Sequence, residues 1–342
     1  MRKAFSAILL MLLSAPALAA ADGPYRILRS VTVGGDGGFD YINADSAGRR
    51  LYMARSGKTN PRLLAFDLDS LEQVGEIDGI SAHGAVVDPV SHHGFASSKP
   101  ITMFDANTMA TIKPVAVDGN PDGLSFDAGR IYVLSHSAPN ITAINATDGT
   151  VLGTVNLDAA VEETKGDGNG HLYVALEDKD AVGVVDTKSM TVTARYLLVG
   201  QGGMPAGLAL DAVNRVLFVA CRNPQVMLIM NADTGAILTS LPIGKQNDGV
   251  MFNPNTGEAF APSGDGQLTV VKESGRGRFA VEQVLATAPG ARTIALDRKT
   301  GHIFLMTAEY GPAPPDAPPP PAGRIARGPM LPDSFKIIEI GR

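Results

Sequence analysis

The chain has 342 residues, of which 44% are hydrophobic and 19% charged, and its formal net charge is −6. An acidic surface repels phosphate backbones, so nucleic acid is not an expected partner. Cys221 is the only cysteine, which excludes an internal disulfide. Its place at the end of an apolar run predicts a small buried side chain rather than a reactive thiol.

The first twenty residues predict an export signal. Arg2 and Lys3 form a basic start, residues 7–13 form a short apolar run, and Ala-Leu-Ala at 17–19 fits a cleavage site. The apolar run is too short to span a bilayer and no second one follows, so no membrane span is expected. We therefore expect a signal peptide at 1–20 and a soluble periplasmic or secreted protein, acting as a monomer.

After the leader, the chain repeats one pattern seven times. Each unit carries an aromatic residue in a short apolar run, at intervals of 43, 37, 41, 45, 42 and 44 residues. The seven aromatics are Tyr52, Phe95, Tyr132, Tyr173, Phe218, Phe260 and Phe304. A period of this length matches one four-stranded blade of a β-propeller. The sequence therefore predicts an all-β, seven-bladed β-propeller of four-stranded antiparallel blades.

The units also predict how the ring closes. Each unit supplies four strands, a to d, but the seventh ends at FKIIEI (335–340) and lacks strand d. Residues 25–33, YRILRSVTV, read like the strand d of the other units. Pairing this N-terminal strand beside residues 335–340 would complete the last blade and remove both free edges. We expect one propeller domain over residues 25–342.

A proline-rich insertion, residues 311–334, separates strands b and c of the seventh unit. Its proline density favours extended, polyproline-like chain. Two interpretations remain open from the sequence. The segment is either a solvated surface loop or a functional arm that covers a site or docks a partner.

Candidate functional residues follow from the expected ring. Strand a of each blade lines the central channel, and the d–a and b–c connections emerge on one face, here called the top face. The residues just before strand a are Tyr41, His83, Asp122, Glu162, Ala206, Asp248 and Arg292. The b–c connections add an outer ring: Arg55, His136, Glu177, Asp178, Arg222, Asn223 and Glu309. We predict a ligand-binding site made of His83, Asp122, Glu162, Asp248, Arg292 and Arg222.

Three carboxylates and a histidine at one mouth also suggest a divalent cation. Asp122, Glu162 and Asp248 offer hard oxygen ligands, and His83 offers a fourth. The alternative is that these side chains bind no ion, and only contact water and the neighbouring Arg292 at the mouth of the channel. The register at Glu162 is open by one residue, because its unit lacks the x-Gly pair that precedes strand a elsewhere.

The repeats resemble the YncE-like, or YVTN-repeat, β-propellers of exported bacterial proteins. The resemblance lies in IYVLS, LYVAL and LFVAC, each followed by a strand that ends in a turn such as VVDTKS or MNADTG. It covers residues 25–342 and implies the fold and export. It implies no set of catalytic residues in this chain.

Three functions therefore remain as hypotheses, and the last of them is a module that docks a protein partner through the proline-rich insertion. The first is a binding or interaction scaffold that takes a small molecule or a protein partner on its polar top face. The second is a metal-assisted hydrolase or lactonase. In the second, Asp122, Glu162 and Asp248 would hold the ion. His83 would then act as general base, and Arg292 would stabilise the oxyanion.

Overall fold

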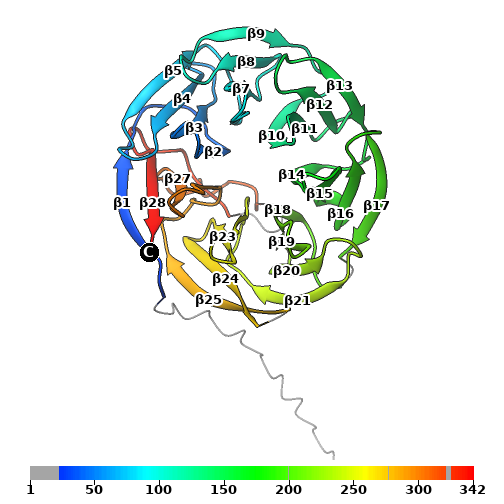
Figure 1. Cartoon of the computed structure of the whole chain (residues 1–342). Coiled ribbons are helices and arrows are strands. Elements are labelled where there is room, and N and C mark those ends of the chain that lie inside the picture. The colour runs from blue at the N-terminus through cyan, green and yellow to red at the C-terminus, as the bar shows by residue number, and fades with distance from the viewer. Residues whose placement is uncertain (1–22, 199, 276, 321–324) are drawn as a thin grey trace, which may run out of the picture.

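The computed structural model describes residues 23–198, 200–275, 277–320 and 325–342, and the expected signal peptide lies outside them. Seven four-stranded sheets stand around a central axis (Figure 1). The only helical element in these residues is a 3-10 turn, η1 (Glu177–Lys179). The described part of the chain contains no helix of the length and apolar character that crossing a membrane requires.

Each blade runs from the axis outward in chain order. Blade 1 contains β2 (Ile42–Asp45), β3 (Arg50–Arg55), β4 (Arg62–Asp67) and β5 (Gln73–Asp78). Blade 2 contains β6 (Ala85–Val87), β7 (His93–Ala96), β8 (Ile101–Asp105) and β9 (Thr111–Val115). Blade 3 contains β10 (Pro121–Asp127), β11 (Arg130–Ser135), β12 (Ile141–Asn145) and β13 (Val151–Val155). Blade 4 contains β14 (Val161–Gly166), β15 (His171–Leu176), β16 (Ala181–Asp186) and β17 (Thr191–Leu197).

The remaining blades follow the same order, except that the outermost strand of blade 7 comes from the start of the described chain. Blade 5 contains β18 (Pro205–Asp211), β19 (Val216–Arg222), β20 (Gln225–Asn231) and β21 (Ile237–Pro242). Blade 6 contains β22 (Met251–Asn253), β23 (Glu258–Ser263), β24 (Gln267–Gly275) and β25 (Arg278–Ala286). Blade 7 contains β26 (Ile294–Leu296), β27 (Ile303–Thr307), β28 (Lys336–Gly341) and β1 (Arg26–Thr32). All-β architecture and seven four-stranded antiparallel blades are therefore confirmed.

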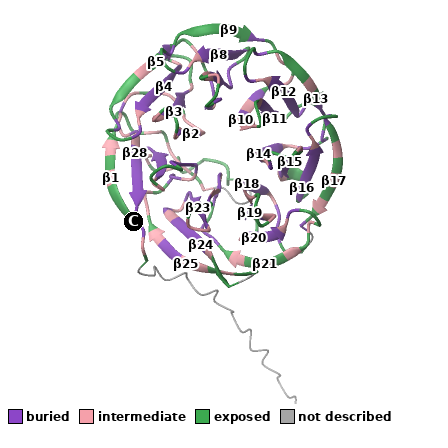
Figure 2. Ribbon diagram, in the orientation of Figure 1, coloured by how far each residue is buried: buried purple, intermediate pink, exposed green. Residues whose placement is uncertain are grey.

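The hydrophobic core lies between neighbouring blades rather than at the axis. The second and third strands of each blade are buried on both faces, so they read as continuous apolar runs. The outermost strands meet solvent on one face and alternate, as β17 does, and Figure 2 shows this rim as exposed. The seven marker aromatics are at most 1% exposed. The aromatic repeat is thus the signature of inter-blade packing.

The N-terminal strand closes the ring as predicted. β1 pairs antiparallel with β28, from Arg26 opposite Gly341 to Thr32 opposite Lys336. Tyr25, near the start of the described residues, and Arg342 both contact the buried Glu258 of blade 6. The Tyr25 hydroxyl donates to Glu258 Oε2 at 2.6 Å, and Arg342 forms an ion pair with the same carboxylate. Closure therefore joins blade 6 as well as blade 7 to the N-terminus.

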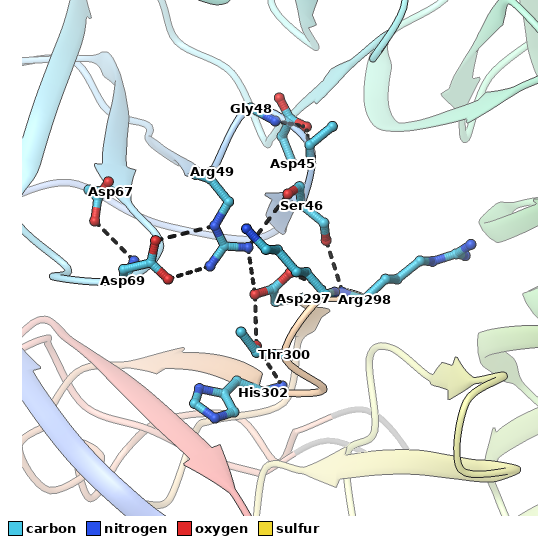
Figure 3. Close-up of polar contacts among 12 residues, drawn as sticks. Asp45, Ser46, Gly48, Arg49, Asp67, Asp69, Asp297, Arg298, Thr300 and His302 are labelled. Atoms are coloured by element: carbon cyan, nitrogen blue, oxygen red, sulfur yellow. Dashed lines mark hydrogen bonds and ion pairs between the residues drawn. The ribbon is translucent and has the colours of Figure 1, made fainter.

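A buried ion pair joins blades 1 and 7 on the face opposite the top face (Figure 3). Arg49 donates to Asp297 Oδ2 of blade 7 at 2.7 Å and to Asp69 of its own blade. The Asp297 side chain is 1% exposed. Burial tends to raise its pKa, but hydrogen bonds from Arg49, Thr300 and the Lys299 amide together lower the pKa below its ordinary value. Arg215 bridges Asp167 and Asp233 between blades 4 and 5 in the same way.

Replacing Asp297 by asparagine is expected to lower the free energy of unfolding by about 1.5–3 kcal/mol at pH 7, since it removes a charged hydrogen bond from a buried site. A depressed folded-state pKa stabilises the native state above the unfolded-state pKa of about 4 and loses that effect as the pH falls through the folded value. The gap between wild type and Asp297→Asn in urea unfolding should therefore close below about pH 4. A gap independent of pH would show that the charge does not matter.

Candidate functional site

The residues that precede the innermost strands converge at the top end of the channel. Asp40 and Tyr41 precede β2, His83 precedes β6, Asp122 opens β10 and Glu162 opens β14. Further along the chain, Asp248 precedes β22 and Arg292 precedes β26. Two side chains from b–c connections, His136 and Arg222, reach the same place. We call this set, excluding Tyr41, the charged mouth.

Buried Arg222 organises one half of the charged mouth. Its side chain is 1% exposed, and its two terminal nitrogens contact Glu162, Glu177 and Asp248, with Oε1 of Glu162 at 3.2 Å. Its Nε donates to the carbonyl of Asn247 at 3.1 Å. Arg292 Nε lies 3.0 Å from the other oxygen of Asp248. One guanidinium therefore holds carboxylates from blades 4 and 6 together.

Two half-exposed histidines line the other half. His83 Nδ1 lies 3.1 Å from Asp40 Oδ2 and 3.2 Å from Asp122 Oδ1. His136 Nε2 lies 3.5 Å from the second oxygen of Asp122 and 4.0 Å from Glu162 Oε1. Arg292 NH2 lies 4.0 Å from Asp40 Oδ1.

These contacts form one closed circuit in which acids and bases alternate. The order is Asp40, His83, Asp122, His136, Glu162, Arg222, Asp248, Arg292 and back to Asp40. All seven blades contribute to it. With neutral histidines the circuit holds two more negative than positive charges, so it favours a cationic ligand.

The pKa shifts follow from burial and from this crowding of carboxylates. Burial raises the pKa of Asp122, and Asp40 adds to the shift while His83 and His136 oppose it. Burial also raises the pKa of Glu162 well above its ordinary value, against the effect of Arg222. A hydrogen bond with Asp40 raises the pKa of His83. Burial acts to lower the pKa of Arg222, but its three carboxylates outweigh burial and raise it.

Tyr41 forms the floor of the charged mouth. Its ring lies against two glycines of neighbouring blades. A Cβ on Gly84 would fall 2.7 Å from the tyrosine Cβ, and one on Gly123 would fall 3.3 Å from its hydroxyl. Burial raises the Tyr41 pKa well above its ordinary value, and Asp122, Glu162, Asp40 and Asp248 raise it further. The phenol is therefore subject to the negative charge of four carboxylates.

A cavity of about 730 Å³ lies along the channel below this floor. Its wall is formed by the innermost strands of all seven blades, and Tyr41 and Asp248 lie on that wall. Glu163 faces this channel and accepts the Leu208 amide at 2.7 Å and the Val250 amide at 3.1 Å. It also pairs with Lys165 at 2.8 Å. The open register is thus resolved: Glu162 faces the mouth and Glu163 braces blades 5 and 6.

The structure brings all six predicted binding residues into the charged mouth. It does not bring the four predicted metal ligands together, because Glu162 and Asp248 contact Arg222. The ligand-type atoms that lie within 4.8 Å of one another belong to Asp40, His83 and Asp122. Asp40 lies one residue before the position used to find the other axial residues, and for this reason sequence reasoning missed it.

Several outer-ring residues lie apart from the circuit. Arg55 is fully buried under the N-terminal loop, where it donates to the carbonyls of Gly35, Asp36 and Gly37. Asp178 accepts the Ala160 amide, and exposed Glu309 pairs with Lys336. The b–c connections therefore supply His136 and Arg222 to the charged mouth, and Glu177 contacts Arg222 beside it.

Comparisons with known proteins bear on the fold. No protein-family model matches the sequence, and no curated protein matches it. A chain of the solved structure titled "Crystal Structure of Mitotic Checkpoint Complex" has a TM-score of 0.71 and 14% identity, covering 88% of this chain and 95% of that one. The RRP9 WD40 repeats have a TM-score of 0.70 and 12% identity, covering 94% and 99%. The fold is a seven-bladed β-propeller of the WD40-like shape.

Proposed function

We propose that the protein is an exported binding scaffold that takes its ligand at the charged mouth. The observation that carries this is the closed circuit of alternating charges, to which every blade contributes. Such a circuit is already ordered before a ligand arrives, so binding would cost little rearrangement. Its excess of carboxylates over arginines favours a ligand that presents a cationic group, either a small molecule or a basic segment of a protein.

Membership of the YncE-like, YVTN-repeat family and a periplasmic or secreted location are part of this proposal. They rest on the repeat sequences and on the expected signal peptide. One structure of similar shape belongs to a checkpoint complex, which accords with a scaffold role. We also propose that the protein is a monomer, and the pairing of β1 with β28 supports this because it leaves no free sheet edge in blade 7.

A metal-assisted hydrolase or lactonase is the second candidate. The cluster of Asp40, His83 and Asp122 favours it, because three ligand-type side chains leave coordination positions for water and substrate. Arg292, which is 22% exposed, faces the same mouth and could stabilise an oxyanion. The scaffold remains the first choice because Arg222 ties down two of the carboxylates that the sequence assigned to the ion.

The scaffold proposal is tested by a thermal-shift screen of the mature chain against alkyl diamines and short basic peptides, with dicarboxylates and acidic peptides as matched opposites. Cationic compounds should raise the melting temperature, because a ligand that binds only the native state stabilises it. The shift should be lost in Asp122→Asn and kept in Asp186→Asn, which alters an exposed turn carboxylate of blade 4. Equal shifts in the two variants would contradict binding at the mouth.

A further inference from the structure

The short contacts among Asp40, His83 and Asp122 are not fully explained by one hydrogen bond. His83 Nδ1 faces two carboxylate oxygens, at 3.1 Å and 3.2 Å, but a ring nitrogen carries at most one proton. The contact with Asp40 has hydrogen-bond geometry. The contact with Asp122 is an ion pair by distance alone. Asp122 therefore lies close to the nitrogen without accepting a hydrogen bond from it.

Asp122 is left short of donors. Its side chain is only 18% exposed. No described residue donates a hydrogen bond to it, and its contacts within ion-pair distance are the ring nitrogens of His83 at 3.2 Å and His136 at 3.5 Å. A carboxylate that receives no hydrogen bond from the protein keeps its oxygens available to a cation. Its Oδ1 faces the side where His83 and Asp40 converge.

The spacing fits a bound ion. Ligands bound to one ion at about 2.1 Å lie about 3.0–3.4 Å from one another in octahedral or tetrahedral geometry. The two nitrogen–oxygen distances, 3.1 and 3.2 Å, fall in that interval. All three ligand atoms lie within 4.8 Å of one another. An ion could therefore be held with small side-chain movements.

We propose that Asp40, His83 and Asp122 bind one divalent transition-metal ion of the Zn²⁺ or Mn²⁺ class. This names a ligand for the charged mouth and so rests on the proposed function. One imidazole nitrogen with two carboxylates suits these metals. Calcium is not expected, because it needs six to eight oxygen ligands. Three protein ligands on a half-open mouth leave positions for water or for a donor group of a bound molecule.

The surroundings of the three ligands support this assignment. The His83 carbonyl accepts the Tyr41 amide at 3.0 Å, and its own amide contacts Ser97 Oγ at 3.2 Å, so its backbone is held from both sides. His136 lies beside the second oxygen of Asp122, and Arg292 lies beside the second oxygen of Asp40. Groups at such positions orient the ligating carboxylates. Arg222 meanwhile keeps Glu162 and Asp248 away from the ion.

The test is isothermal titration of the metal-stripped mature chain with Zn²⁺ and, separately, with Mn²⁺. We expect one ion per chain, and an affinity at least tenfold weaker in Asp40→Asn, His83→Gln and Asp122→Asn. Two controls should bind as tightly as wild type. Asp186→Asn changes a turn carboxylate of blade 4 outside the charged mouth. His171→Gln changes a histidine–aspartate pair at 2.9 Å in a different turn.

A second measurement keeps the proposal falsifiable if a variant folds poorly. Co²⁺ added to the wild-type chain should show a visible spectrum with a histidine nitrogen ligand, and His83→Gln should lose it. Absence of one-site binding in the wild type, or equal affinity in all variants, would overturn the metal site. Cationic compounds that still bind the mouth in that case would leave the scaffold proposal standing. Ion binding without any binding of cationic compounds would support the metal site and contradict the proposed preference for cationic ligands.

Discussion

Replacing Arg222 by methionine is expected to lower the free energy of unfolding by about 3–5 kcal/mol, because it leaves buried carboxylates without their counter-charge. Glu162 and Asp248 have side chains only 8% and 9% exposed, and the guanidinium touches both. Methionine has a comparable length, so the loss would report charge more than volume. Urea unfolding monitored by circular dichroism at pH 7 measures the effect.

A rescue experiment separates charge from packing in the same region. Adding Glu162→Gln and Asp248→Asn to Arg222→Met should recover part of the lost stability, since the carboxylates are then neutral. Arg292→Met is the matched control, because Arg292 is 22% exposed and contacts Asp248 from the solvent side. Arg292→Met should lower the free energy of unfolding clearly less than Arg222→Met does. A triple variant as unstable as Arg222→Met alone would refute the uncompensated-charge explanation.

The architecture could be predicted from the sequence because it follows from a local repeat. Each blade buries its second and third strands against both neighbours, so every unit carries the same apolar run around its marker aromatic. Closure was also predictable, since a seventh unit without its last strand leaves only residues 25–33 to fill the gap. The contacts of Tyr25 and Arg342 with Glu258 were not predictable, because they join residues 233 and 84 positions apart through side chains alone.

The charged mouth could be predicted only in part. Convergence follows from blade geometry, and this placed His83, Asp122 and Arg292 correctly at the axis. Which acid meets which base depends on side-chain length and rotamer. Arg222 reaches inward from a b–c connection far enough to hold Glu162 and Asp248, and no spacing rule carries that information. The predicted ion position and the buried arginine therefore compete for the same carboxylates.

The glycine that opens several units has a function that its pattern did not reveal. The x-Gly pair predicts the start of an innermost strand. In blades 2 and 3 it also makes room for Tyr41, since side chains on Gly84 or Gly123 would meet the tyrosine. The glycines thus allow an aromatic floor under the charged mouth. Sequence reasoning treated Tyr41 as one of seven axial residues, whereas its ring contacts two further blades.

Deleting residues 25–33 is expected to abolish cooperative unfolding, a loss comparable with the whole stability of about 5–15 kcal/mol of a folded domain. Without β1, the outer edge of β28 is unpaired, and Ile337, Ile338 and Ile340, which are at most 2% exposed, lose cover. The matched control removes residues 312–320, also nine residues, from the largely exposed proline-rich insertion. That variant should keep a sharp calorimetric transition.

A synthetic peptide of residues 25–33 offers the reverse experiment, because an exposed sheet edge can accept a strand from another chain. Added to the shortened protein, the peptide should restore the transition in proportion to its concentration. A peptide with Tyr25→Ala should restore it less well, since Tyr25 donates to Glu258 and packs on Phe260 with ring centroids 5.2 Å apart. A sharp transition in the shortened protein alone would show that the ring is stable without its closing strand.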